Sequence, residues 1–169
     1  MMHKKETTIR KIIYILSIFL ILAFFIPIVS VVDEARQLML ENKTYENLAD
    51  ISMYEYCKIF KNPDFYRSLT DFELKFNIGI YSFTVWSGVL FIISVFKRWY
   101  KIAIFWSIIS MLSYSAVIAD ILMKGIVGKE YSKAIFAFGC YFVGIMIILI
   151  FALSITLQVI KRKRKTITI

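Results

Sequence analysis

The sequence is poor in the residues from which most catalytic and metal centres are built. Its 169 residues include one histidine, His3, and two cysteines, Cys57 and Cys140. A single histidine excludes both a metal site built on several histidines and a Ser-His-Asp triad. The six glycines form no Gly-rich phosphate-binding loop. No catalytic, cofactor-binding or metal-ligating residue is therefore predicted, and no cofactor is expected.

Acidic residues are also scarce, with 12 Asp and Glu against 21 Lys and Arg, which gives a net charge of +9. Such an excess can indicate nucleic-acid binding. Here the basic residues stand at the ends of apolar runs, a pattern typical of membrane topology signals rather than of a basic binding face. The sequence therefore predicts no nucleic-acid partner.

Apolar residues are abundant and are gathered into long blocks. They make up 59% of the chain, and the mean hydropathy is +0.70, whereas soluble domains are about 45–50% apolar. The first block, 12–32, holds 21 residues without a charge. As a helix it would be about 31 Å long, which matches a hydrocarbon core of about 30 Å. Its length and the lack of an A-x-A-like cleavage site favour a retained span over a signal peptide.

Four such blocks predict an all-α polytopic membrane protein, a four-transmembrane-helix bundle with a mostly helical outer loop between helices 1 and 2. Pro27 is expected to kink the first helix. The fourth block, with 27 uncharged residues, is longer than one perpendicular crossing needs and should tilt or protrude. The predicted order is a cytoplasmic tail 1–11, helix 12–32, outer loop 33–75, helix 76–96, cytoplasmic hairpin 97–101, helix 102–123, outer loop 124–133, helix 134–160 and cytoplasmic tail 161–169.

The orientation follows from the Lys and Arg residues of the short segments. With both termini inside, the inner segments carry four, three and five basic residues and a single acid, Glu6. Because basic residues in short loops stay on the cytoplasmic side, both termini are predicted to be cytoplasmic. The expected location is the plasma or cytoplasmic membrane.

The outer segment 33–75 is the one sizeable polar region, with nine acids and six bases. Apolar residues recur in it at helical spacing, and Asn62-Pro63 marks a turn, so two or three short amphipathic helices are expected. Asn42 begins an Asn-Lys-Thr glycosylation sequon, which matters only in a secretory-pathway host. Cys57 falls in this segment and Cys140 in a span, so they should not pair with each other. An intermolecular bridge through Cys57 stays open.

Two groups of polar residues are candidate sites. Ser110, Ser113 and Asp120 fall on one face of the predicted helix 102–123. Such a face could line a water-filled path, or it could pack against another helix, where small and hydroxyl residues permit close approach. Asp120 lies three residues from the outer end of this helix, where it can reach water, and it could pair with Lys124, one helical turn further on. The basic cluster Lys161, Arg162, Lys163, Arg164 and Lys165 could fix the topology, recognise anionic lipid, or do both.

These patterns favour a non-enzymatic protein that acts through protein–protein contacts, as an accessory, assembly, regulatory or immunity-type subunit. Its expected partners are membrane lipids and either another membrane or extracytoplasmic protein or a second copy of itself. The alternative is a protomer of an oligomeric channel or small transporter, with the polar face of helix 102–123 lining the path, and a membrane-embedded enzyme comes third. The order of segments resembles the claudin and peripheral-myelin tetraspans. Their W-GLW-C-C signature is absent, since 33–75 contains no Trp and one Cys, so this resemblance of topology implies no function.

Overall fold

The computed structural model describes residues 2–32, 50–61, 71–123, 126–127 and 134–167 and is mostly helical. Four of its helices contain stretches long and apolar enough to cross a membrane, at 4–25, 75–96, 100–123 and 138–164. Many of their large apolar side chains, such as Trp86, Phe105 and Leu112, are exposed on the outside of the bundle. This outer surface supports an integral membrane location. The helices are α1 (Met2–Leu22), α4 (Asp71–Phe96), α5 (Tyr100–Met123) and α6 (Phe138–Ile167).

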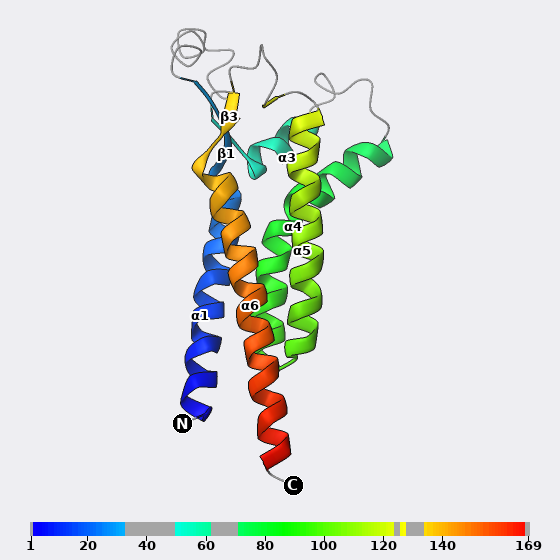
Figure 1. The fold of residues 1–169 in the computed structure, drawn as a ribbon. Helices are drawn as coiled ribbons and strands as arrows, with labels where there is room; N and C mark the ends of the chain where they lie inside the picture. The colour runs from blue at the N-terminus through cyan, green and yellow to red at the C-terminus, as the bar shows by residue number, and fades with distance from the viewer. Residues whose placement is uncertain (1, 33–49, 62–70, 124–125, 128–133, 168–169) are drawn as a thin grey trace.

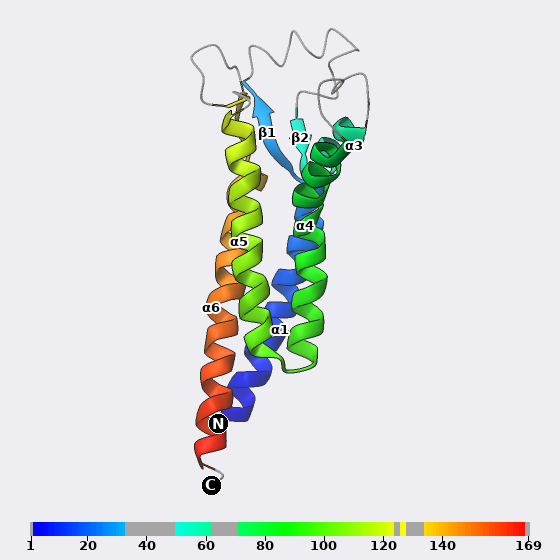
Figure 2. The ribbon, with the colours of Figure 1, turned by 90° about the vertical axis from the view of Figure 1, so that its right-hand side faces the viewer.

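Each of the four helices packs against two neighbours, in the cyclic order α1, α4, α5, α6 (Figures 1 and 2). Both chain termini and the α4–α5 turn lie at the same end of the bundle, which we call the basal end (Figure 1). The opposite, apical end carries a small sheet and the short helix α3 (Met53–Lys61). This arrangement agrees with the predicted four crossings.

The first helix differs from its prediction at both ends. Residues 12–32 were expected to form one helix kinked at Pro27, but α1 begins at Met2 and ends at Leu22. A 3-10 turn over Ala23–Phe25 follows, and then strand β1 (Pro27–Val31). Proline disfavours helical backbone in the residue before it, and Ile26 is extended, with φ −84° and ψ 135°. Pro27 therefore starts a strand instead of kinking a helix.

The all-α prediction is also corrected, because a three-stranded sheet closes the apical end. Strand β1 lies in the middle and pairs antiparallel with β2 (Asp50–Ser52) and β3 (Ala134–Phe136). Residues 134–136 had been assigned to the fourth span. The helix that follows begins at Phe138 and continues to Ile167, so it takes in the basic cluster that was predicted to end it.

Helix α3 confirms a helix in the outer segment, where short amphipathic helices were predicted; 33–49 and 62–70 fall outside the described residues. The helix begins with a capping box: Glu55 N–H donates to Ser52 Oγ (3.2 Å), and Ser52 N–H donates to Glu55 Oε2 (2.7 Å). Met53, Tyr56 and Cys57 are buried where α3 packs along α4. Because Cys57 is only 7% exposed, an intermolecular disulfide through it is not favoured.

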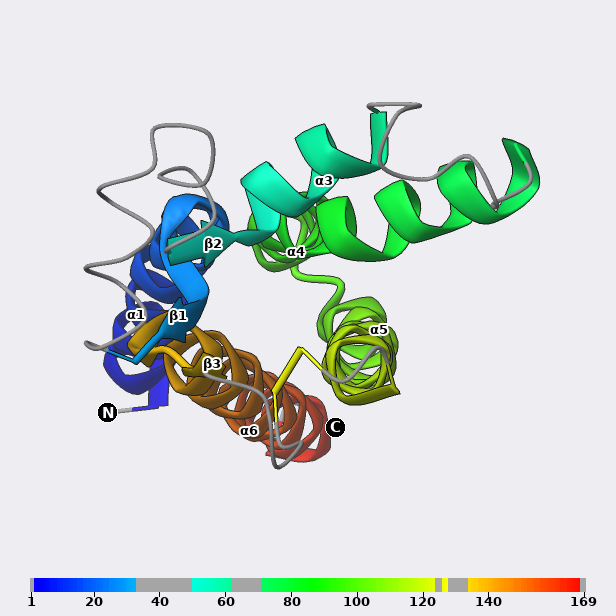
Figure 3. The same cartoon turned by 90° about the horizontal axis from the view of Figure 1, so that it is seen from above.

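The first turns of α4 run beside α3, sideways from the bundle, before the helix turns down toward the basal end (Figures 1 and 3). A glycine and a serine lie in the first half of α4. Gly79 has no atom within 4 Å of where a Cβ would be, and Ser82 Oγ donates to the Gly79 carbonyl (3.2 Å). Gly and Ser pairs are a recognised cause of sharp helix bends.

Small residues bring the spans close together. Gly88 of α4 lies against Ser17 and Ile21 of α1, where an added Cβ would be 2.9 Å from the Ser17 carbonyl oxygen. The hydroxyls of Ser17, Ser87, Ser107 and Ser110 bond within their own helices, as when Ser107 Oγ donates to the Ala103 carbonyl (2.8 Å). These serines therefore act, like Gly88, as small packing residues between helices. The buried serines of the four spans are Ser17, Ser87, Ser94, Ser107, Ser110 and Ser154.

Candidate functional site

The three residues predicted to share a polar face on α5 lie in different surroundings. Ser110 is 2% exposed, and its Oγ donates to the Trp106 carbonyl of the same helix (2.8 Å). Ser113 and Asp120 are half-buried. The Asp120 carboxylate bonds to a different helix: it accepts a hydrogen bond from Tyr81 Oη of α4 (2.7 Å). The arrangement resembles a helix–helix contact more than a water-lined path.

The Tyr81–Asp120 bond joins α4 to α5, and the Tyr81 ring also contacts α3. Tyr81 is 1% exposed, and its ring lies 5.0 Å from the ring of Tyr56 in α3, centroid to centroid. One helical turn further along α4, Thr84 Oγ1 approaches Met53 Sδ at the start of α3 (3.3 Å). Asp120 was expected to pair with Lys124, which lies outside the described residues. The partner that the structure gives, Tyr81, was not predicted.

Tyr81→Phe is expected to lower the free energy of unfolding by about 1 kcal/mol, because it removes one hydrogen bond to a carboxylate without creating a cavity. The loss can be measured by detergent-denaturant titration of the purified protein in mixed micelles. Tyr141→Phe removes the same hydroxyl from a ring that is 61% exposed, and should change stability by less than about 0.3 kcal/mol. Equal effects of the two substitutions would contradict a stabilising role for the Tyr81–Asp120 bond.

A second polar cluster closes the basal end. Glu6 of α1 is 6% exposed; its carboxylate accepts from Tyr100 Oη of α5 (2.8 Å) and pairs with the Arg164 guanidinium of α6 (2.6 Å). Three helices thus meet on one carboxylate. From the sequence, Glu6 was counted only as a charge, and no partner was predicted for it. Its signal was its position, since it is the lone acid among Lys4, Lys5, Arg10 and Lys11.

The α4–α5 turn is fixed beside this cluster. Arg98 has a left-handed backbone (φ 57°), and Trp99 N–H donates to the Ser94 carbonyl (2.7 Å), which ends α4 sharply. Lys161 Nζ of α6 donates to the Arg98 carbonyl (2.9 Å) and lies 5.5 Å from the centre of the Tyr100 ring. A basic side chain near the end of α6 therefore supplies a hydrogen bond to a carbonyl oxygen of the turn.

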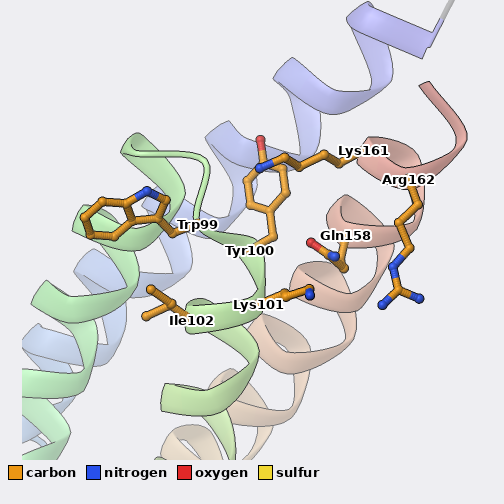
Figure 4. Close-up of a pocket in the computed structure, with 7 residues that line it drawn as sticks. All are labelled: Trp99, Tyr100, Lys101, Ile102, Gln158, Lys161 and Arg162. Atoms are coloured by element: carbon orange, nitrogen blue, oxygen red, sulfur yellow. The ribbon is translucent and has the colours of Figure 1, made fainter. Parts of the chain in front are cut away.

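The predicted basic cluster divides into residues with different roles. Lys161 and Arg164 hold the helix ends together through Arg98 and Glu6, as described above. Arg162 and Lys163 are exposed, and Lys165 is part of α6. Beside Arg162, the first turn of α5 and the last turns of α6 enclose a cavity of about 420 Å³ that is open to the outside (Figure 4).

The apical cap consists of α3 and the three strands. Ser30 Oγ of β1 donates to Asp50 Oδ1 of β2 (2.5 Å), and Ala137 N–H donates to the Ile28 carbonyl (2.9 Å), so the start of α6 is bound to the sheet. Exposed aromatic side chains lie at its edge, where the rings of Phe25 and Tyr54 are 5.1 Å apart and Lys58 Nζ is 4.4 Å from the Tyr54 ring centre. The cap thus offers an ordered surface with aromatic and cationic groups.

Among the residues that the structure describes, no three His, Cys, Asp or Glu side chains gather as metal ligands do. Comparisons of the chain with protein-family models, with curated proteins and with solved structures find no match.

Proposed function

We propose that this chain is a non-enzymatic, four-span membrane protein that works through contact with another protein at its apical end. On this proposal the contact surface consists of the cap and the outer segment 33–75, and the four spans serve as its scaffold. The distribution of Lys and Arg supports a plasma or cytoplasmic membrane location with the basal end, and so both termini, in the cytoplasm.

The observation that carries the proposal is that the two acidic groups of the four stretches long enough to cross a membrane, and Ser110 of the predicted polar face, are bonded within the bundle. Asp120 is bound to Tyr81, Glu6 to Tyr100 and Arg164, and Ser110 to its own helix. A transport path needs polar groups that exchange partners with water or substrate. Polar groups that already bond to one another favour a structural role for the spans over a transport path.

The apical cap supports the second half of the proposal. Strands β1 and β2 are paired, Val29 with Ile51 and Ser30 with Asp50. The pairing fixes the end of β1 beside the start of β2. A recognition surface built on paired strands loses less conformational entropy when a partner binds.

The test is cross-linking in native membranes, followed by capture of the tagged chain. Lys43→Glu with Lys58→Glu should reduce the captured partner at least tenfold, because reversed charges at an interface repel a complementary partner. Lys97→Glu with Lys163→Glu makes the same charge change at the basal end and should leave capture unchanged, as should Asp120→Asn. Capture of homo-oligomers alone would contradict the proposal. So would loss of function in Asp120→Asn accompanied by solute flux in wild-type proteoliposomes.

A further inference from the structure

The basal cavity combines unpaired positive charge with exposed apolar surface. Lys101 of α5 and Arg162 of α6 line it and are exposed, and within the described residues neither has an ionic partner. Figure 4 shows Lys101 reaching from α5 toward α6, where Gln158 and Arg162 lie. The two cations and the amide of Gln158 are hydrogen-bond donors from two helices beside one cavity.

Glu6, the acid bonded to Tyr100 of the lining, leaves this charge uncompensated. The Glu6 carboxylate is already occupied by Tyr100 and Arg164, and no acidic residue lines the cavity in the part of the chain that the structure describes. Lys161, a third cation in the lining, is held by the Arg98 carbonyl, so it adds positive potential without moving into the cavity. An anion entering the cavity would therefore meet a net positive site.

The walls of the cavity are fixed before any ligand arrives. Tyr100 is 1% exposed and is bound to Glu6, which sets the rotation of the first turn of α5. The Lys161–Arg98 bond sets the distance between the turn and α6. The two helix ends that form a site held in this way need little rearrangement when a ligand binds.

The apolar part of the lining favours a lipid over a soluble anion. Trp99 is 52% exposed and Ile102 is 41% exposed, and both border the cavity where the predicted span meets the cytoplasmic hairpin. Indole rings settle at the level of lipid head groups. Basic pockets between helix ends on the cytoplasmic side bind anionic head groups.

We propose that this cavity binds the phosphate head group of an anionic phospholipid of the inner leaflet. Arg162 and Lys101 contact the phosphate oxygens, Gln158 donates to the head group, and the start of an acyl chain lies along Ile102. Guanidinium groups bind phosphate through paired N–H donors, and ammonium groups bind it as point charges. The proposal does not depend on the apical partner proposed above.

The test is native mass spectrometry of the full chain in detergent, titrated with phosphatidylglycerol and, separately, with phosphatidylcholine. The wild type should bind phosphatidylglycerol more tightly than phosphatidylcholine. Lys101→Gln with Arg162→Gln should weaken phosphatidylglycerol binding about twenty-five-fold, on the basis of about fivefold per basic side chain. Lys97→Gln with Lys163→Gln removes the same two charges at the same end, outside the cavity, and should weaken binding less than threefold. Equal losses in the two variants would overturn the proposal in favour of diffuse attraction.

Two further arms identify the ligand and guard against misfolding. Lys101→Arg with Arg162→Lys preserves both charges and should keep binding within about threefold of the wild type. Glycerol 3-phosphate should compete only weakly with the lipid; competition at equal concentration would overturn the lipid assignment in favour of a soluble phosphate. A photoactivatable phosphatidylglycerol should label 99–102 and 158–162 of the unmodified chain, and labelling confined to other segments would overturn the site.

Discussion

Gly139→Ala is expected to lower the free energy of unfolding by about 2–3 kcal/mol, because a methyl group at this position has no room. Gly139 is at the start of α6, where an added Cβ would meet the Pro27 carbonyl oxygen and lie 2.9 Å from Ile26 Cγ2. A clash with a backbone oxygen cannot be relieved by a change of rotamer. The preceding Ala137 N–H is bonded to the Ile28 carbonyl, so α6 cannot move away without breaking that bond.

Gly144→Ala is the matched control for this prediction. It lies in the same helix, and its new Cβ would be 3.5 Å from Tyr114 Cε1, an ordinary van der Waals contact. Alanine is a better helix former than glycine by about 1 kcal/mol, so this variant should be neutral or slightly more stable. Denaturant titration in mixed micelles measures both variants. If Gly139→Ala were as stable as Gly144→Ala, the result would contradict the close approach of Gly139 in α6 to Pro27 in β1.

The sequence was sufficient to locate four helices long and apolar enough to cross a membrane, because long apolar blocks with at most one charge have few other uses in a protein. It did not locate where helix gives way to strand. Hydropathy is the same for an apolar helix and an apolar strand, so Ile28 and Val29 were read as the end of a span. Pro27 and the β-branched residues after it carried the signal for a strand. The three-residue strands at Asp50–Ser52 and Ala134–Phe136 are too short to show a period.

The candidate sites, too, could be predicted from the sequence only in part. Asp120 could be found because a carboxylate inside an apolar block is costly without a partner. The identity of that partner could not be predicted, since Tyr81 is 39 residues away in the chain. Glu6 and Tyr100 are 94 residues apart and meet only when α1 and α5 are placed around one bundle. The helix at Met53–Lys61 was predictable, because the Ser52–Glu55 capping box and the apolar spacing agree.

Glu6→Ala is expected to lower the free energy of unfolding by about 2 kcal/mol, the second large effect. The substitution leaves the Tyr100 hydroxyl and the Arg164 guanidinium without the carboxylate that satisfies them. Breaking a fully buried ion pair costs about 3–5 kcal/mol. Because the Arg164 side chain is 39% exposed, it recovers part of its hydration, and the lower figure follows. The loss should be local to the basal end, with α1 and α6 separating there first.

A double-mutant cycle separates the Glu6–Arg164 pair from other effects of the substitution. If the pair acts as a unit, Arg164→Ala in the Glu6→Ala background should cost at least about 1 kcal/mol less than in the wild type. Glu6→Gln keeps an acceptor for Tyr100 and should be less damaging than Glu6→Ala. Lys5→Ala, an exposed neighbour in α1, should change stability by less than about 0.5 kcal/mol. Purely additive losses from Glu6 and Arg164 would contradict the pair, because a carboxylate that joins α1 to α6 cannot be removed independently of the cation it binds.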